Sequence, residues 1–529
     1  MASIVVQTLG GLGLFLLGMI IMTDSLRSLA GDAMRKLLLR FTHTPLSGAV
    51  TGTVATLIMQ SSSATTVAAV GMVGAGLMGF TEALGIIFGA NIGTTIKGWL
   101  FVMLGFKFKI GELLLPLILV GVLLRLFARG RWSSIGMSIA GFGLIFVGIY
   151  LMQQGMETVQ QIVTPENFPA NTLLGRFQLL LMGMLFSAVT QSSSAGVAIT
   201  LTALHAGAIN LPQAAALVVG MDVGTTVTAA LATIGGTVGS RRTGLSHVIY
   251  NFFTGAGALL FITPYVMLWQ WLAPEMLISN AEIVLIAFHT SFNTLGVVIV
   301  LPLTHRFARM IEWLIPETAP VYTRALDRNL LKQPPLAIAA ARSALNAESI
   351  ALLRHVLFEL GDRANGRYSN LVELKNDLFK THAYIDAIEP GEAASKTHEQ
   401  LVSLFHTMDH VQRLFDRCYE DARRANIAAN MQELKDDREK VMAILVQIVN
   451  DLEQAQPLDA AERSSVLVAD VSGRVDTLRN QVMVSVAHSE ISADEGTRRL
   501  EAIRWLDRVS EHVSRLTHHL ATVMANGSS

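Results

Sequence analysis

Gln-Ser-Ser-Ser occurs twice in the sequence, at 60–63 and at 191–194, each time inside an apolar stretch. If a helix breaks at each motif, serine hydroxyls and the free backbone N–H groups of a helix N-terminus meet at one point, and such a point favours an oxyanion. The carbonyl ends of the preceding half-helices, with the side-chain oxygens of Gln60 and Gln191, suit a hard cation such as Na⁺. The predicted anion ligands are Ser61, Ser62, Ser63, Ser192, Ser193 and Ser194.

The motif belongs to a longer internal repeat. The offset between its copies, 191 − 60 = 131, also carries residues 89–95 onto 220–226 and Gly52 onto Gly183. Residues 11–18 match residues 141–148 at an offset of 130. One serine run alone can bond back to its own helix or assist helix packing, but its recurrence within a whole repeat favours a binding role.

Each copy has a second polar element downstream of the serines. In the first copy Asn91, Thr94 and Thr95 stand among glycines, which weaken a helix, so unwound carbonyls there would complete a cation shell. The second copy has Asp222, Thr225 and Thr226 at the equivalent positions. A carboxylate in the middle of an apolar segment is costly and is a functional candidate by default; the alternative is a neutral or paired aspartate used for packing.

Lys97 lies well inside a predicted membrane span. If the two copies face each other across a pseudo-two-fold axis, Lys97 approaches Asp222 of the other copy; snorkelling of the lysine to the nearer membrane interface is the alternative. Two pairs at i, i+4 spacing either bond between helices or line a proton or ligand path: His247 with Asn251, and His289 with Asn293.

Composition separates a membrane part from a soluble part. The 529 residues are 51% hydrophobic and 15% charged, which is too apolar for an ordinary soluble enzyme. Charged residues are sparse up to about residue 315 and frequent beyond residue 323. A net charge of −1 argues against a nucleic-acid partner. The single cysteine, Cys418, excludes an intrachain disulfide framework.

Hydrophobic length predicts the membrane topology. About 20 apolar residues cross a bilayer, and seven segments qualify: 4–23, 81–104, 111–128, 134–153, 212–238, 245–270 and 281–303. The segments beside each serine motif, 46–59 and 64–78 and their equivalents within 174–208, are too short and are expected to form re-entrant helical hairpins. Three crossings in the first copy would invert the second, as in many secondary transporters.

Basic residues between the apolar segments predict the orientation. Lys and Arg favour cytoplasmic loops, which places the N-terminus outside and the C-terminal domain in the cytoplasm. The residues assigned to the cytoplasmic side are Arg27, Arg35, Lys36, Arg40, Arg125, Arg129, Arg131, Arg241, Arg242, Arg306 and Arg309.

The fold class is therefore predicted as all-α. Residues 1–155 hold the first repeat and the first span of the second, 156–315 hold the rest of the second repeat, and 316–335 form a linker. Amphipathic periodicity in 336–525 predicts a soluble bundle of six helices, grouped as two bundles of three. The predicted helices are 337–363, 367–388, 395–424, 428–454, 460–489 and 493–524, with breaks at Gly366, Pro390-Gly391, Asn426 and Pro457.

Each serine motif is followed by a G-x-N/D-x-G-T-T element, and Ser246-His-Val-Ile-Tyr-Asn251-Phe follows the second copy. With these motifs, about residues 1–310 resemble the sodium/phosphate cotransporter family. The resemblance implies Na⁺ and inorganic phosphate contacts at 60–63 and 191–194, with supporting oxygens from the second polar elements. Asp222 departs from the asparagine expected there. A carboxylate can bind Na⁺ more strongly or carry a proton instead, so the number and identity of the coupling ions are left undecided. No nucleotide-binding or hydrolase motif accompanies these residues, so we expect an ion-driven transporter rather than an enzyme.

The C-terminal part looks like a PhoU domain, a cytoplasmic helical module. Its acidic helix-face motifs imply a divalent or iron-type metal, although an acidic stripe is more often a solvated face. The candidate metal ligands are Asp409, Asp416, Glu420, Asp507 and Glu511.

Three functions fit these features. The first is a sodium-coupled inorganic phosphate symporter working by alternating access, with phosphate, Na⁺ and the bilayer as partners and a homodimer as a possible assembly. The second is a phosphate exporter of the same fold. The third is a regulatory membrane anchor for the PhoU-like domain, which gives no purpose to two hydroxyl-rich hairpins at bilayer depth.

Overall fold

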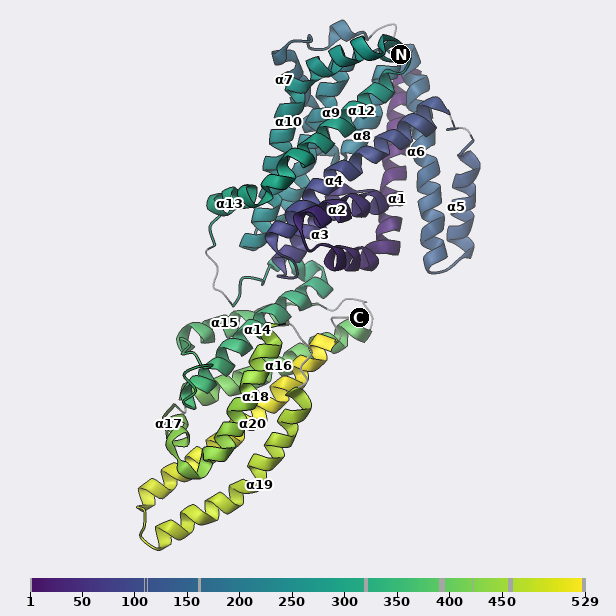
Figure 1. Cartoon of the computed structure of the whole chain (residues 1–529). Coiled ribbons are helices and arrows are strands. Elements are labelled where there is room, and N and C mark those ends of the chain that lie inside the picture. The colour runs from purple at the N-terminus through teal and green to yellow at the C-terminus, as the bar shows by residue number, and fades with distance from the viewer. Residues whose placement is uncertain are drawn as a thin grey trace. The chain divides into compact units, whose positions relative to one another are not determined.

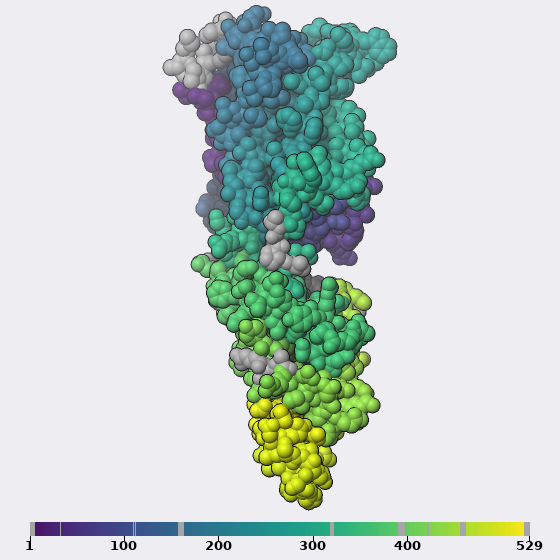
Figure 2. All heavy atoms as spheres, turned by 90° about the vertical axis from the view of Figure 1, so that its left-hand side faces the viewer, coloured from purple at the N-terminus to yellow at the C-terminus, as the bar shows by residue number. Residues whose placement is uncertain are grey.

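The computed structural model describes residues 2–108, 110–111, 113–159, 163–317, 322–389, 395–420, 422–454 and 460–525, and these form helices joined by turns, with no strand among them. The chain divides into two compact units. The first comprises Met1–Val73 and Leu77–Glu317, and the second comprises Thr318–Ser529 with the short turn Gly74–Gly76. In Figure 2 the first unit runs in colour from purple to teal and the second from green to yellow. The all-α prediction is confirmed.

The first unit contains most of the apolar helices. Eight described helices in the chain are long and apolar enough to cross a membrane. Those of the first unit overlap six of the predicted spans and have apolar exposed side chains such as Phe252, Phe253 and Trp271, as a lipid-facing surface requires. The long helices of the first unit are α1 (Ala2–Phe41), α4 (Phe80–Leu100), α6 (Arg131–Val159), α7 (Leu173–Thr190), α9 (Leu211–Ala232), α10 (Val238–Leu272) and α12 (Ala281–Val300).

Two predicted lengths are wrong. The expected span 111–128 is the helix α5 (Leu115–Phe127), whose 13 residues reach about 20 Å, because the described turns before it and a proline at its start delay the helix. In the second copy, α7 has 18 residues and qualifies as a span by length and composition, where a half-length helix was expected. The eighth apolar helix, α14 (Pro334–Glu359), belongs to the second unit, where it is mostly buried by its neighbours.

A helix ends and another begins at each serine motif, as expected, although α7 is longer than expected. In the first copy α2 (Pro45–Met59) is followed by α3 (Ser62–Gly74), and in the second α7 is followed by α8 (Ser193–His205). The remaining described helices of this unit are η1 (Phe101–Lys107), η2 (Pro165–Asn167), α11 (Pro274–Ser279), η3 (Leu301–Leu303) and α13 (Thr304–Leu314). Figure 1 shows the C-terminal end of α1 and the α5–α6 turn at the same end of the unit, opposite the N-terminus. Both carry arginines that were assigned to the cytoplasmic side.

Glycines of the repeat hold two helix pairs close together. A Cβ on Gly89 of α4 would lie 1.8 Å from the carbonyl oxygen of Ala49 in α2, and one on Gly220 of α9 would lie 2.0 Å from that of Leu180 in α7. Both members of the first pair map onto the second at the offset of 131. The glycines thus allow close helix packing while α4 and α9 stay continuous, so the expected unwinding beside Asn91 is wrong.

A second pair of glycine contacts joins α1 to α6. A Cβ on Gly11 would lie 2.8 Å from the carbonyl oxygen of Gly148, and one on Gly18 would lie 2.7 Å from that of Gly141. At the offset of 130, Gly141 is the repeat equivalent of Gly11 and Gly148 is that of Gly18. Each of the two glycines in α1 therefore contacts the equivalent of the other one. The two helices pack antiparallel and self-complementary, as elements related by a two-fold axis do.

Six long helices make up most of the second unit. Helix α14 packs with α15 (Leu371–Asp386) and α16 (Ser395–Glu420), while α18 (Lys435–Glu453), α19 (Ala460–Ala487) and α20 (Ala493–Ala525) pack with one another. Contacts between α16 and α20 join the groups. Helix α14 also packs against α18, so the division into two bundles of three stays a prediction. Short helices complete the unit: η4 (Arg328–Lys332), α17 (Ala422–Asn430) and η5 (Gln432–Leu434).

One expected helix break in this unit is misplaced. Asn426 lies within α17, which packs on α20 and buries Ala425 and Ala428, and the helix ends at Asn430 instead. Gly366 lies in the turn between α14 and α15 as expected. The breaks expected at Pro390-Gly391 and Pro457 fall outside the described residues.

Candidate functional site

The chain breaks its helices at the glutamine of each serine motif. Gln60 has φ 52° and ψ 29°, and Gln191 has φ 51° and ψ 28°, so both are left-handed C-caps of the preceding helix. This conformation costs a residue with a Cβ about 1–2 kcal/mol. It persists in both copies because the surrounding packing fixes it, and such positions cluster at functional sites.

The first serine of each motif caps the helix that follows. Ser61 Oγ accepts a hydrogen bond from the Ala64 backbone N–H at 3.1 Å, and Ser192 Oγ accepts one from the Ala195 N–H at 3.2 Å. These caps fix the N-termini of α3 and α8, whose dipoles have their positive ends at the motif. Ser61 and Ser192 therefore fix the backbone at the start of the two helices.

Both motifs line one pocket of about 400 Å³. At about 30 Å³ per water molecule, this volume admits a small oxyanion with several waters. Helix α1 contributes apolar residues and Thr23, and Thr225 from α9 also lines the pocket. The predicted site residues that line it are Gln60, Ser61, Ser62, Ser63, Gln191, Ser192, Ser193, Ser194 and Thr225.

Lys97 lies between the two motifs. Its Nζ donates to the carbonyl oxygen of Gln60 and, at 3.2 Å, to Ser194 Oγ. The side chain is buried, with 6% of the residue exposed. The hypothesis that Lys97 pairs with Asp222 is wrong, because the ammonium bonds to the broken end of α2 and to α8, and the carboxylate bonds to α12. The alternative of snorkelling is wrong as well, because the side chain is buried.

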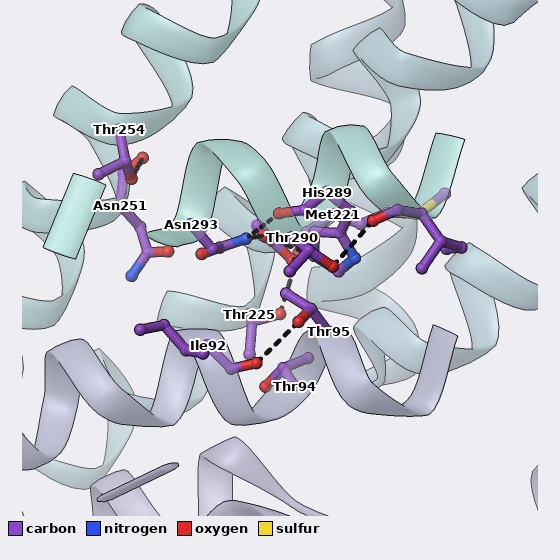
Figure 3. Close-up of polar contacts among 12 residues, drawn as sticks. Ile92, Thr94, Thr95, Met221, Thr225, Asn251, Thr254, His289, Thr290 and Asn293 are labelled. Atoms are coloured by element: carbon purple, nitrogen blue, oxygen red, sulfur yellow. Dashed lines mark hydrogen bonds and ion pairs between the residues drawn. The ribbon is translucent and has the colours of Figure 1, made fainter. Parts of the chain in front are cut away.

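Asp222 belongs to a buried polar cluster formed with α12. His289 Nε2 lies 3.0 Å from Asp222 Oδ2, and Asn293 Nδ2 donates to the same oxygen at 2.9 Å. Figure 3 shows His289 and Asn293 in the same region as Thr225 and as Thr95 of α4. The His289–Asn293 pair therefore bonds between helices. Asn251 of the other pair donates to the carbonyl of His247 in its own helix.

Several polar atoms of this cluster lack a hydrogen-bond partner among the described residues although they are buried: His289 Nδ1, Asn293 Oδ1, His247 Nδ1 and Tyr250 Oη. Buried polar atoms are normally paired. Unpaired ones around a carboxylate leave oxygen and nitrogen donors for a bound cation or water. Thr225 stands one helical turn beyond Asp222 and connects this cluster to the pocket along α9.

The remaining predicted cation ligands bond to their own helices. Asn91 Nδ2 donates to the Ile87 carbonyl at 3.0 Å, Thr94 Oγ1 to Ala90 at 3.0 Å and Thr95 Oγ1 to Ile92 at 2.8 Å. In the second copy Thr226 Oγ1 donates to the Val223 carbonyl at 2.7 Å. All four side chains are buried, but they lie outside the lining of the pocket between the serine motifs.

Sequence reasoning missed Asp24 and Thr190, which also line the pocket. Thr190 directly precedes the second motif. The signal for Asp24 was a carboxylate at the end of the first predicted span, 4–23. It is exposed and, with Lys97, makes up the charged residues of the pocket lining.

The acidic residues of the second unit give no support to a metal centre. Among the described residues no group of three His, Cys, Asp or Glu side chains is arranged to hold a metal. Asp409 instead pairs with Arg413 at 2.8 Å and Glu511 with Arg515 at 2.7 Å, each one turn along its own helix. Asp507 accepts from Ser472 and Asp416 from Gln412, while the Glu420 side chain falls outside the described residues.

Known proteins resemble most of the chain. "Uncharacterized protein YqeW" of Bacillus subtilis is 31% identical over 302 residues, which are 57% of this chain and 95% of that protein. "Putative inorganic phosphate export protein YjbB" of Escherichia coli (strain K12) is 25% identical over 415 residues, 76% of this chain and 74% of that protein. No solved structure gives a significant match. A family model described as Na+/Pi-cotransporter matches residues 14–154 and 164–295, just over half of the chain. The chain therefore belongs to the Na⁺/Pi-cotransporter family, whose members are transporters and not enzymes.

Proposed function

We propose that this protein carries inorganic phosphate across a bacterial inner membrane by alternating access, through the pocket between its two serine motifs. The observation that carries the proposal is that residues 131 positions apart, 60–63 and 191–194, line one cavity of about 400 Å³. Hydroxyls and the positive ends of α3 and α8 converge there, and both are suited to a tetrahedral oxyanion. The family membership supplies the substrate class.

The proposed mechanism uses two inverted repeats. The reciprocal contacts of Gly11 with Gly148 and of Gly18 with Gly141 support a two-fold axis between α1 and α6. The repeated glycine contacts of α4 with α2 and of α9 with α7 support equivalent packing inside each half. Rocking of one such half against the other would expose the shared pocket to each side of the membrane in turn. The hairpins α2–α3 and α7–α8 are then re-entrant, with their tips near the midplane.

Sodium is the proposed coupling ion, as the family description implies. Gln60 Nε2 donates to the carbonyl of Leu57, which leaves its side-chain oxygen for a cation. Asp222 with its unpaired neighbours forms a second group of hard donors, and such donors suit a cation of this kind. The proposed cation ligands are Gln60, Gln191, Asn91, Thr94, Thr95, Asp222, Thr225 and Thr226.

Phosphate export is a second candidate, because the Escherichia coli relative YjbB is named as an inorganic phosphate export protein. Both directions use the same pocket, because net flux follows the gradients and the gating. The second unit would act as a cytoplasmic PhoU-like domain in either case, with the N-terminus outside and a homodimer as a possible assembly.

Purified protein in proteoliposomes tests the proposal. Radiolabelled phosphate flux is measured with an imposed Na⁺ gradient in either direction, with K⁺ in place of Na⁺ as the control. Flux that follows the Na⁺ gradient supports symport, and flux that persists without Na⁺ favours phosphate transport without sodium coupling. Absence of any phosphate flux in both orientations refutes phosphate transport.

A further inference from the structure

We propose that the Lys97 ammonium is the fixed counter-charge for the transported oxyanion, and that it ties the two serine motifs together when the anion is absent. The inference deepens the proposed phosphate transport and rests on it. Lys97 stands in α4, outside both motifs, and the motif pattern does not include it.

The position of the ammonium supports a role toward an anion. Lys97 lines the pocket together with all eight motif residues, and it is buried. Its Nζ donates to the Gln60 carbonyl, which belongs to the negative end of α2, and to Ser194 Oγ in the first turn of α8. One lysine thus contacts a residue of the first motif and a residue of the second.

The coordination of the ammonium is incomplete. An ammonium has three N–H donors, and its contacts with described residues, Gln60 O and Ser194 Oγ, account for two of them. Asp24, the other charged lining residue, forms no ion pair with Lys97 among the described residues. A buried charge with no ionic partner is costly. A bound oxyanion would remove that cost by accepting the remaining donor and supplying the opposite charge.

Anion binding then changes the contact between the two motifs. An oxyanion that binds Lys97 competes with the Gln60 carbonyl and with Ser194 for the ammonium. Loosening these bonds frees the first motif from the second, which is the step that movement of one half against the other requires. The proposed ligand class is a tetrahedral oxyanion that bears one or two negative charges.

Chemical modification of a single cysteine at position 97 can test the effect of the side-chain charge separately from that of the side-chain shape. Cys418 is the only cysteine in the sequence, so Cys418→Ser with Lys97→Cys carries one thiol. Reaction with 2-aminoethyl methanethiosulfonate restores an ammonium, whereas 2-hydroxyethyl methanethiosulfonate adds a neutral group of similar size; in each case the thiolate forms a disulfide and methanesulfinate leaves. Lys107→Cys in the same background is the matched control, because Lys107 is exposed, bonds to Asn280 and lies outside the pocket lining.

Two readouts are compared on full-length, monodisperse protein: equilibrium binding of radiolabelled phosphate in detergent, and phosphate flux in proteoliposomes. Lys97→Cys is expected to weaken phosphate binding about 10- to 100-fold. The aminoethyl adduct is expected to recover most of the affinity, the hydroxyethyl adduct none, and phosphate is expected to slow the modification. The Lys107 control should bind like the parent throughout.

Equal binding by the parent, the unmodified cysteine variant and both adducts would overturn the inference. Recovery by the hydroxyethyl adduct to the same extent would also overturn it, because shape alone would then suffice. A parent protein that neither binds nor moves phosphate would instead refute the proposed function itself.

Discussion

Gln60 and Gln191, 131 positions apart, have the same left-handed backbone conformation, with φ of 52° and 51°. Each residue ends one helix, and a capping serine directly afterwards starts the next. Two such breaks line one pocket, which gives the first unit a polar centre.

Replacing the second serine of either motif should weaken phosphate binding. Ser62→Ala or Ser193→Ala removes a hydroxyl donor to a charged oxygen, a bond of about 1.5–3 kcal/mol, and should raise the half-saturation concentration for phosphate flux by at least about tenfold. Ser138→Ala in α6 is the control, because Ser138 bonds to its own helix and lies outside this pocket. Unchanged flux kinetics in both motif variants would exclude these serines as phosphate ligands.

Small residues at the helix contacts should be required for folding. Gly89→Ala and Gly220→Ala place a Cβ 1.8 Å and 2.0 Å from backbone oxygens that cannot move independently of their helices. Overpacking of this kind costs about 1–3 kcal/mol or more, so the thermal midpoint in detergent should fall or the protein should aggregate. Gly257→Ala in α10 meets nothing within 4 Å and should behave like the parent. Parent-like midpoints in both contact variants would contradict the packing.

Neutralising Asp222 should change ion coupling more than phosphate binding. Asp222→Asn keeps an oxygen for His289 and Asn293 but removes the carboxylate charge that would hold a cation. We expect the Na⁺ concentration for half-maximal flux to rise by about tenfold or more, with a smaller change for phosphate. Glu275→Gln in the exposed helix α11 is the control. An Asp222→Asn protein with parent-like Na⁺ dependence would remove Asp222 from the cation site.

Acid should destabilise the second unit through a histidine cluster between α16 and α20. The ring of His519 stacks on His406 and His410 at centroid distances of 4.9 Å and 5.5 Å. Partial burial, and then repulsion from these histidines and from His518, lowers the pKa of His519 to about 4. As the pH falls, the His519 imidazole of the unfolded chain is therefore protonated before that of the folded chain. The contribution to stability is complete above the ordinary pKa of about 6.5 and is lost as the pH falls toward 4.

Calorimetry of the full chain at pH 7.5 and pH 5.0 tests this sign. The thermal midpoint of the second unit should be lower at pH 5.0, and the difference should shrink in His519→Gln, which cannot take up the proton. His488→Gln, an exposed histidine away from the cluster, should keep the full difference. An equal pH effect in His519→Gln and the parent would show that His519 does not cause it.

Local patterns in the sequence were enough for the helical class, most spans, the repeat and both helix breaks. Apolar length fixes which helices suit a bilayer, and a Gln-Ser-Ser-Ser motif between two short apolar stretches leaves no continuous span. The length of α5 was wrong and the break expected at Asn426 was misplaced, because local turns and packing on α20 override the local propensity there.

The partners of individual polar side chains depended on tertiary structure. From the sequence, the glycines near Asn91 predicted unwinding, yet they allow α4 to pack against α2 without any unwinding. The sequence left Lys97 either to pair with Asp222 or to snorkel to the membrane interface, yet the lysine is buried and bonds to Gln60 and Ser194. Asp222 bonds to His289 and Asn293 instead.

The sequence by itself thus determined the periodic features of this protein: its apolar spans, its repeated motif and the positions at which helices break. Only the tertiary structure decided which buried charge meets which dipole. The reason is physical, since periodicity is set by neighbours along the chain, whereas a buried ammonium or carboxylate binds whatever donor or acceptor packing brings within about 3 Å.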